Sequence, residues 1–255
     1  MSKIFAFSNQ KGGVGKTTTA INLATDVARL GKKVLLLDFD PQGNATSGFG
    51  IEKNQLEFTC YDMLMETCEA KQIILPTMID NLSIIPSNID LAAAEVDLVN
   101  VPSRESALKR ALSAIQNDYD YIFIDCPPSL GLITLNALVA CTGVIIPIQS
   151  EFFALEGLSQ LMNTIKIVKQ RLNPQIYING VILTMYDTRT TMSKQVTAEI
   201  YKYFGDKIYT VPVPRNIKLV ESPSFGVPVI LHAPHCSGAL AYDALAKQFL
   251  SREEN

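Results

Sequence analysis

The stretch NQKGGVGKTT at residues 9–18 follows directly on the apolar run IFAF at residues 4–7. An apolar run, a glycine-rich stretch and a helical pattern in this order predict a buried strand, a tight turn and a helix start. Such a turn aims backbone N–H groups and the positive end of a helix at phosphate oxygens. The sequence therefore predicts a phosphate-binding loop within a nucleotide-binding α/β domain.

The loop is a variant of the common pattern G-x-x-x-x-G-K-[ST], because Gln10 stands where the first glycine belongs. It fits K-G-G-x-G-K-[ST] instead, a form with a second lysine, Lys11, which has no evident phosphate to hold in a single loop. We expect Lys16 to reach the outer phosphates and the Thr17 hydroxyl to join a magnesium shell. The predicted phosphate-binding residues are Lys11, Gly12, Gly13, Val14, Gly15, Lys16, Thr17 and Thr18.

Two more apolar runs end in aspartates. VLLL at residues 34–37 leads to Asp38 and Asp40, and YIFI at residues 121–124 leads to Asp125. Ligands of open parallel α/β sheets bind at the carboxyl ends of strands, so these carboxylates belong beside the loop. We predict that Asp125 holds magnesium through a bound water and that Asp40 orients or deprotonates an attacking water. Asp38 either supports the magnesium shell or caps a turn, and the sequence leaves both alternatives open.

The composition is that of a globular protein. The chain has 255 residues, of which 47% are hydrophobic and 18% charged, and this fits one domain over residues 1–255. Apolar runs alternate with helical patterns, which predicts a three-layer α/β fold with a mostly parallel, twisted sheet and helices on both faces. Five scattered cysteines, and no signal peptide or long apolar span, favour a cytoplasmic protein without a membrane partner.

Several motifs together resemble the ParA/Soj family of DNA-partitioning ATPases, which has the P-loop NTPase fold. They are the loop at Lys11 to Thr18, the segment from Asp38 to Asn44, DCPPS at 125–129 and PRN at 214–216. The loop variant alone defines a superfamily that also includes MinD-type ATPases, nitrogenase iron proteins and iron–sulfur carriers. The stretches EFFALEG at 151–157 and VPRNIKLVESPSFG at 213–226 are similar to the chromosomal ParA pattern.

The resemblance implies ATP and Mg²⁺ as cofactors and a weak ATPase whose catalytic residues are Lys11, Lys16 and Asp40. It implies that ATP closes two copies into a homodimer in which each Lys11 reaches the partner's phosphates. Hydrolysis, stimulated by a ParB-type centromere-binding protein, would release the dimer from DNA, so the protein is expected at the nucleoid. Beside the adenine the resemblance places Met185, Pro212, Val213, Pro214 and Asn216.

Any DNA site has to be local, because the net charge is −3. Residues 187–218 carry six basic and three acidic side chains, a net charge of +3. Charge alone favours an ordinary solvated surface here, but the resemblance implies non-specific binding of double-stranded DNA by Arg189 and Lys218. It leaves Lys194, Lys202 and Lys207 open.

Two alternative functions are less consistent with the sequence. A MinD-like membrane- or cargo-positioning ATPase would need a basic amphipathic tail, but the apolar pattern at Leu240, Ala241, Ala244, Leu245 and Phe249 ends in REEN at residues 252–255. This pattern predicts a helix packed on the domain. A non-enzymatic interaction protein that uses nucleotide only for structure is disfavoured by the joint presence of Lys16, Asp40 and Asp125. The two histidines and the cysteine at 232–236 are interpreted as polar loop residues rather than a zinc site.

Overall fold

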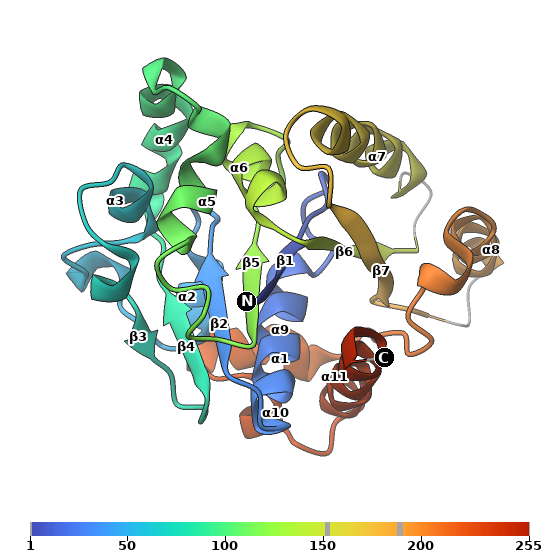
Figure 1. Cartoon of the computed structure of the whole chain (residues 1–255). Coiled ribbons are helices and arrows are strands. Elements are labelled where there is room, and N and C mark those ends of the chain that lie inside the picture. The colour runs from blue at the N-terminus through green and yellow to red at the C-terminus, as the bar shows by residue number, and fades with distance from the viewer. Residues whose placement is uncertain (1, 151–153, 188–190, 255) are drawn as a thin grey trace.

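The computed structural model describes residues 2–150, 154–187 and 191–254 (Figure 1). Its strands form one seven-stranded sheet in the order β3-β4-β2-β5-β1-β6-β7, in which only β3 runs antiparallel to its neighbour. The strands are β1 (Lys3–Phe7), β2 (Val34–Asp38), β3 (Leu75–Pro76), β4 (Leu82–Ile85), β5 (Tyr121–Asp125), β6 (Gly143–Gln149) and β7 (Tyr177–Thr184). The predicted mostly parallel sheet is confirmed.

Helices cover both faces of the sheet (Figure 1). One face packs against α3 (Cys60–Leu64), α4 (Ala94–Asp97), α5 (Ala107–Leu112), α6 (Leu132–Ala140), α7 (Ala154–Arg171) and α8 (Thr191–Phe204). The other packs against α1 (Lys16–Arg29), α2 (Asn44–Gly48), α9 (Ile217–Glu221), α10 (Val229–His232) and α11 (Ser237–Glu254). The three-layer α/β prediction is thus confirmed.

Strand β1 shows how the sequence produces two cores. Successive side chains of a strand point to opposite faces, so Ile4 and Ala6 join one core while Phe5 and Phe7 join the other. Both faces are covered, and for this reason the strand is apolar throughout rather than alternating. The register pairs Phe7 and Asp38 with Asp125, which brings the predicted carboxylates to one edge of the sheet.

Helix α11 packs on the domain, as the tail pattern predicts. Ala241, Leu245 and Phe249 are buried, and the Phe249 ring lies 5.0 Å from that of Phe5. Leu240 departs from the prediction, since it is 58% exposed. It lies in the first turn of the helix, where Gly238 rather than Leu240 makes the close approach to Leu219 of α9. Among the described residues, no helix has both the length and the apolar character needed to span a membrane.

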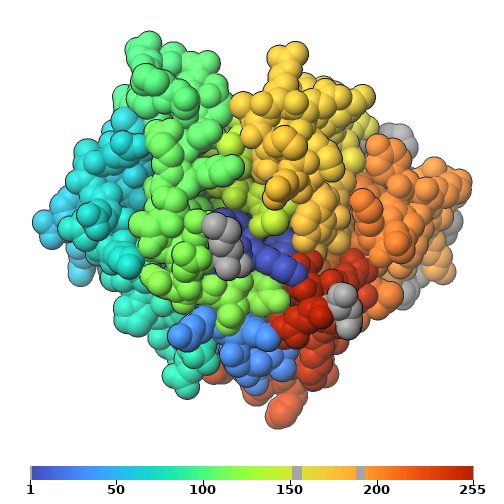
Figure 2. Space-filling model, viewed as in Figure 1, coloured from blue at the N-terminus to red at the C-terminus, as the bar shows by residue number. Residues whose placement is uncertain are grey.

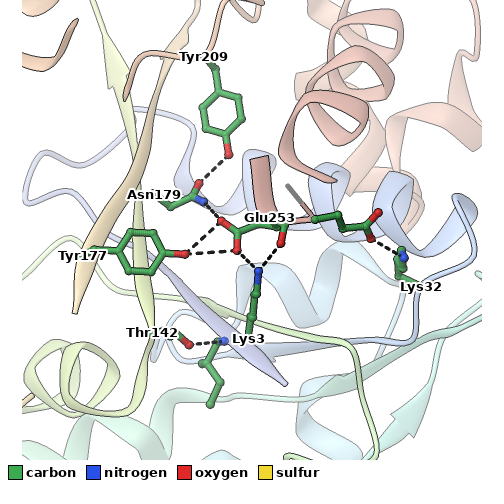
Figure 3. Close-up of polar contacts among 9 residues, drawn as sticks. Lys3, Lys32, Thr142, Tyr177, Asn179, Tyr209 and Glu253 are labelled. Carbon is green, nitrogen blue, oxygen red and sulfur yellow. Dashed lines mark hydrogen bonds and ion pairs between the residues drawn. The ribbon is translucent and has the colours of Figure 1, made fainter. Parts of the chain in front are cut away.

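The end of α11 closes the amino edge of the sheet, where β1 and β7 begin (Figure 3). The Glu253 carboxylate accepts hydrogen bonds from the Tyr177 hydroxyl (3.1 Å) and the Asn179 amide (2.6 Å), and it pairs with the Lys3 ammonium (2.9 Å). Figure 2 shows the red end of the chain lying against the dark-blue N-terminal segment on this face. Residues from both ends of the chain therefore share one polar cluster.

Candidate nucleotide-binding site

The predicted phosphate loop connects β1 to α1 at the carboxyl edge of the sheet. Gly13 and Gly15 have φ values of +73° and +80°, in the left-handed region that glycine adopts without strain. Two neighbouring strands hold the loop. The Thr184 hydroxyl of β7 donates to the carbonyl of Val14 (2.7 Å), and the Asn9 amide donates to the carbonyl of Pro147 in β6 (2.8 Å). The N-cap residue of α1 is Gly15, and no side chain among the described residues caps this helix start, so its backbone N–H groups are available to an anion.

Lys16 brings a buried cation to this loop. Its side chain is on the first turn of α1, the residue is 6% exposed, and its ammonium donates to the main-chain carbonyl of Lys11 (3.3 Å). Burial lowers its pKa, and the negative charges of Asp125 and Asp40 act in the opposite direction. A buried ammonium whose hydrogen-bond acceptor is a neutral carbonyl is costly unless an anion joins it.

Asp125 is the corresponding buried anion. Among the described residues, neither of its carboxylate oxygens has a hydrogen-bond partner. Burial, and next the charge of Asp38, raise its pKa well above the ordinary value, while the Thr17 hydroxyl and the Lys16 charge lower it. An orphaned buried carboxylate beside a hydroxyl fits a hard divalent cation. Among the described residues, no group of three His, Cys, Asp or Glu side chains is placed to hold a metal ion. A magnesium ion held by Asp125 would therefore take water and phosphate oxygens for most of its shell, as Mg²⁺ prefers.

Asp38 has its oxygens engaged by hydrogen-bond donors. Oδ2 accepts from the backbone N–H and the hydroxyl of Thr46, both at 2.7 Å, and Oδ1 accepts from the N–H of Asp40 (3.3 Å). Burial raises the pKa of this carboxyl to about 6, against the effect of the Thr46 bonds. Of the two alternatives that the sequence leaves open, these contacts favour the turn-capping one over magnesium coordination.

Asp40 follows in the same turn and is 6% exposed. Its Oδ1 accepts from the N–H of Gln42 (2.9 Å), and its backbone carbonyl accepts from the hydroxyl of Ser87 (2.8 Å). The N–H of Ser87 in turn donates to the Thr46 hydroxyl (2.9 Å). Sequence reasoning missed Ser87 and Thr46. The position of Ser87, just beyond the apolar strand at residues 82–85, is the signal that could have found it.

A cavity of about 310 Å³ opens beside the phosphate loop. Its size is within the range of small-molecule sites. Of the predicted adenine residues it contains Met185, Val213, Pro214 and Asn216, whereas Pro212 lies outside it. Sequence reasoning missed several lining residues: Thr184, Arg215, Leu219, Val220, Pro223 and Tyr242.

Two of these lining residues have distinctive local structure. Met185 has a φ of +48°, which is uncommon for a side chain other than glycine and is often found at ligand sites. Asn216 is already engaged, since its Oδ1 accepts from the Lys218 N–H (2.8 Å) and its amide donates to the Ser237 hydroxyl (2.8 Å). Asn216 thereby caps α9 and fixes one wall of the cavity.

The predicted DNA-binding residues are less well defined by the structure. Arg189 lies outside the described residues. Lys218 lies on α9, where its ammonium pairs with Glu221 (2.8 Å), and the same carboxylate lies 3.5 Å from the His232 ring. The charge of Lys218 is thus partly balanced by a neighbouring carboxylate, although its side chain is 44% exposed.

Comparison with known proteins identifies the family. A family model described as an AAA domain matches residues 2–178. The sporulation initiation inhibitor protein Soj of Bacillus subtilis is 55% identical over 97% of this chain and 98% of its own length. The chromosome partitioning protein ParA of Caulobacter vibrioides is 48% identical over 99% of this chain and 96% of its own.

A solved structure agrees with this assignment at the level of the fold. The cobyrinic acid a,c-diamide synthase from Mycobacterium smegmatis, crystallised with ADP and magnesium, superposes with a TM-score of 0.89 and 36% identity over 100% of this chain and 96% of its own. On its sequence and its fold, the chain belongs to the ParA/Soj family of partitioning ATPases.

Proposed function

We propose that this protein is an ATP-driven switch for partitioning DNA, with residues 1–255 acting as a single ATPase domain. The observation that carries the proposal is the pair of incompletely satisfied buried charges, Lys16 and Asp125, at the phosphate loop. A bound nucleotide with its metal ion would supply an anionic partner for Lys16 and a cationic one for Asp125.

The residues at the site fit ATP and Mg²⁺. Lys16, Thr18 and the N–H groups of the loop would bind the phosphates, and the base would enter the cavity lined by Met185, Val213 and Pro214. Asp125 and the Thr17 hydroxyl would hold the metal, with a water between metal and carboxylate. When bound, the ion neutralises charge on the phosphate oxygens. The ADP and magnesium in the related M. smegmatis structure support this reading.

Hydrolysis needs a water placed in line with the γ-phosphorus. Asp40 is the residue we assign to orient this water and accept its proton, while the bond between the γ-phosphorus and the bridging oxygen breaks and ADP leaves. Lys16 stabilises the charge that develops on the phosphate oxygens. Asp38 acts through the turn, because its bonds to Thr46 and to the Asp40 N–H fix where Asp40 lies.

The second lysine of the loop indicates a dimer. Gly12 and Gly13 are exposed, so a second copy can approach the phosphates from outside. In the proposed ATP-bound homodimer each Lys11 enters the partner's site and adds a positive charge there. Joining two copies would double the DNA contacts made by Arg189 and Lys218, and a ParB-type partner would stimulate hydrolysis and release.

The test is binding to unrelated double-stranded DNA with ATP, ADP or no nucleotide, over a series of salt concentrations. We expect salt-sensitive binding with ATP alone, and persistent binding by Asp40→Ala, which should hold ATP without cleaving it. Arg189→Glu should weaken binding by about tenfold at moderate salt. Lys33→Glu, an exposed lysine at the amino edge, is the matched control. Absence of DNA binding with intact hydrolysis would refute the switch and favour the membrane- or cargo-positioning alternative.

A further inference from the structure

Helix α6 begins directly after the segment 126–131 that follows Asp125. The first N–H groups of a helix have no acceptor inside it, and a side chain at the N-cap position usually supplies one. Here the N-cap residue is Gly131, which has no side chain. The acceptor for this helix therefore comes from elsewhere in the fold.

That acceptor is Glu95 of α4. Its Oε2 accepts from the N–H of Leu132 (2.8 Å), and its Oε1 accepts from the N–H of Ile133 (3.2 Å). A carboxylate at this end also interacts favourably with the helix dipole. Two charge-assisted hydrogen bonds thus tie α4 to the start of α6, across 37 residues of sequence.

Glycine is needed at position 131 for the contact with Glu95 and not for its backbone conformation. Its φ of −76° and ψ of −168° suit any residue. A Cβ atom at this position, however, would clash with the Glu95 carboxyl group, 2.8 Å from its Cδ. The absence of a side chain is what lets the carboxylate reach the backbone of the helix.

The other end of the segment lies at the phosphate loop. The N–H of Cys126 donates to the carbonyl of Phe7, and a Cβ at Gly12 would lie 3.9 Å from the Cβ of Pro128. Inside the segment, the Thr134 hydroxyl of α6 donates to the carbonyl of Ser129 (2.7 Å). Segment 126–131 therefore begins next to Asp125, the carboxylate proposed to hold the metal ion. It passes the exposed Gly12 of the phosphate loop and ends at the start of α6, which Glu95 caps.

We propose that Glu95 is a positioning residue for ATP cleavage: it fixes segment 126–131 against the phosphate loop, so that α4 sets the rate of hydrolysis without touching the nucleotide. The inference rests on the proposed ATPase function. Small displacements of groups beside a reacting centre lower the rate strongly, whereas ADP bound by the loop and the base cavity keeps its contacts.

The first test measures kcat, KM for ATP and the Kd of ADP in three variants. Glu95→Ala should lower kcat by about 10-fold to 100-fold and leave the Kd of ADP within about twofold. Gly131→Ala should lower kcat to a similar extent, because the added methyl group displaces the Glu95 carboxylate. In the Glu95→Ala background, Gly131→Ala should lower kcat little further. Glu95→Gln, which retains one acceptor oxygen, should be intermediate.

A second test separates this role from simple helix capping. Glu95→Ala combined with Gly131→Ser supplies a local cap, and we expect it to restore the thermal midpoint but not kcat. Recovery of kcat by this pair would overturn the proposal, as would an unchanged kcat in Glu95→Ala. Asp97→Asn, on the same helix but bonded to the Tyr61 hydroxyl, is the control and should keep its kcat. A wild-type protein that binds ATP without cleaving it would overturn the proposed function as well.

Discussion

At the carboxyl edge of the sheet two buried ionisable side chains, Lys16 and Asp125, have few partners, whereas at the amino edge the carboxylate of Glu253, whose side chain is 5% exposed, has several. Among the described residues, neither oxygen of Asp125 accepts a hydrogen bond, and the Lys16 ammonium donates to one carbonyl, that of Lys11. At the other edge, the Glu253 carboxylate is bound by Lys3, Tyr177 and Asn179 (Figure 3).

Arg252 extends this second cluster. Its guanidinium lies 4.1 Å from the centre of the Tyr209 ring and donates to the carbonyls of Asp206 (3.1 Å), Lys207 (3.1 Å) and Ile208 (2.8 Å). Fully satisfied buried charges hold elements together, while unsatisfied ones cost free energy and are retained where a ligand compensates them. Glu253 thus has a structural role at the amino edge, while Lys16 and Asp125 have a binding role in the function proposed here.

The largest expected effect is at the carboxyl edge. Lys16→Ala should lower ATP hydrolysis by about 10²-fold to 10³-fold, because it removes a preorganised charge from the phosphates. The same variant should unfold no earlier than wild type without nucleotide, since the cost of burying the ammonium disappears. Phosphate release and thermal unfolding measure the two effects, with the exposed Lys33→Ala as control. If Lys16→Ala lowered the thermal stability but left ATP hydrolysis intact, Lys16 would have a structural role, and the contrast between the two edges of the sheet would be wrong.

The amino edge should respond in the opposite way. Glu253→Ala should cost about 2–4 kcal/mol of unfolding free energy, because Lys3, Tyr177 and Asn179 lose a shared partner. Hydrolysis per folded molecule should stay unchanged. Urea unfolding of Glu253→Ala is compared with that of Glu254→Ala. Glu254 pairs with Lys32 in a partly exposed contact, so its removal should cost less than about 1 kcal/mol of unfolding free energy. Equal losses in the two variants would show that the cluster adds no special stability.

Asp26 tests whether a buried carboxylate without a full set of partners lowers stability at a site away from the nucleotide. It lies far along α1 from the phosphate loop. Its Oδ1 accepts from Arg29 (2.8 Å), its Oδ2 has no partner among the described residues, and burial raises its pKa to about 6. Above pH 6 the buried charge lowers stability, and this cost fades as the pH falls toward the ordinary carboxyl pKa near 4. Asp26→Asn should therefore stabilise the protein by about 1–2 kcal/mol at pH 8 and by less at pH 5.

Unfolding free energies of wild type and Asp26→Asn at the two pH values provide the measurement. The Arg29 side chain on the same helix, and Asp243 and Lys247 on α11, also act on this carboxyl, so they should be left intact. A stabilisation of equal size at pH 5 and pH 8 would contradict the buried-charge explanation. A loss of hydrolysis would instead assign Asp26 a functional role.

The sheet and the residues grouped at its carboxyl edge could be predicted from the sequence, because the loop at residues 9–18 and the aspartates after two apolar runs are local patterns. The contacts of Thr46, Ser87 and Glu95 could not, since each joins segments 8 to 47 residues apart whose pairing depends on the fold. The same holds for Tyr242 of α11, which lines the cavity beside the phosphate loop. The role of Asp38 stayed open in the sequence because two of its three donors belong to Thr46 of α2, and their approach depends on how that helix packs.

The bond between Lys3 and Glu253 joins residues 250 positions apart, and this has a consequence during synthesis. Translation at roughly 5–20 residues per second leaves on the order of 10–50 s between the two residues. For most of this interval the residues of β1 and the phosphate loop have been synthesised, but Phe249, whose ring packs on Phe5, and Tyr242, which lines the cavity beside the loop, have not. The nascent protein therefore completes its nucleotide site only after ribosomes have read nearly the whole of this sequence.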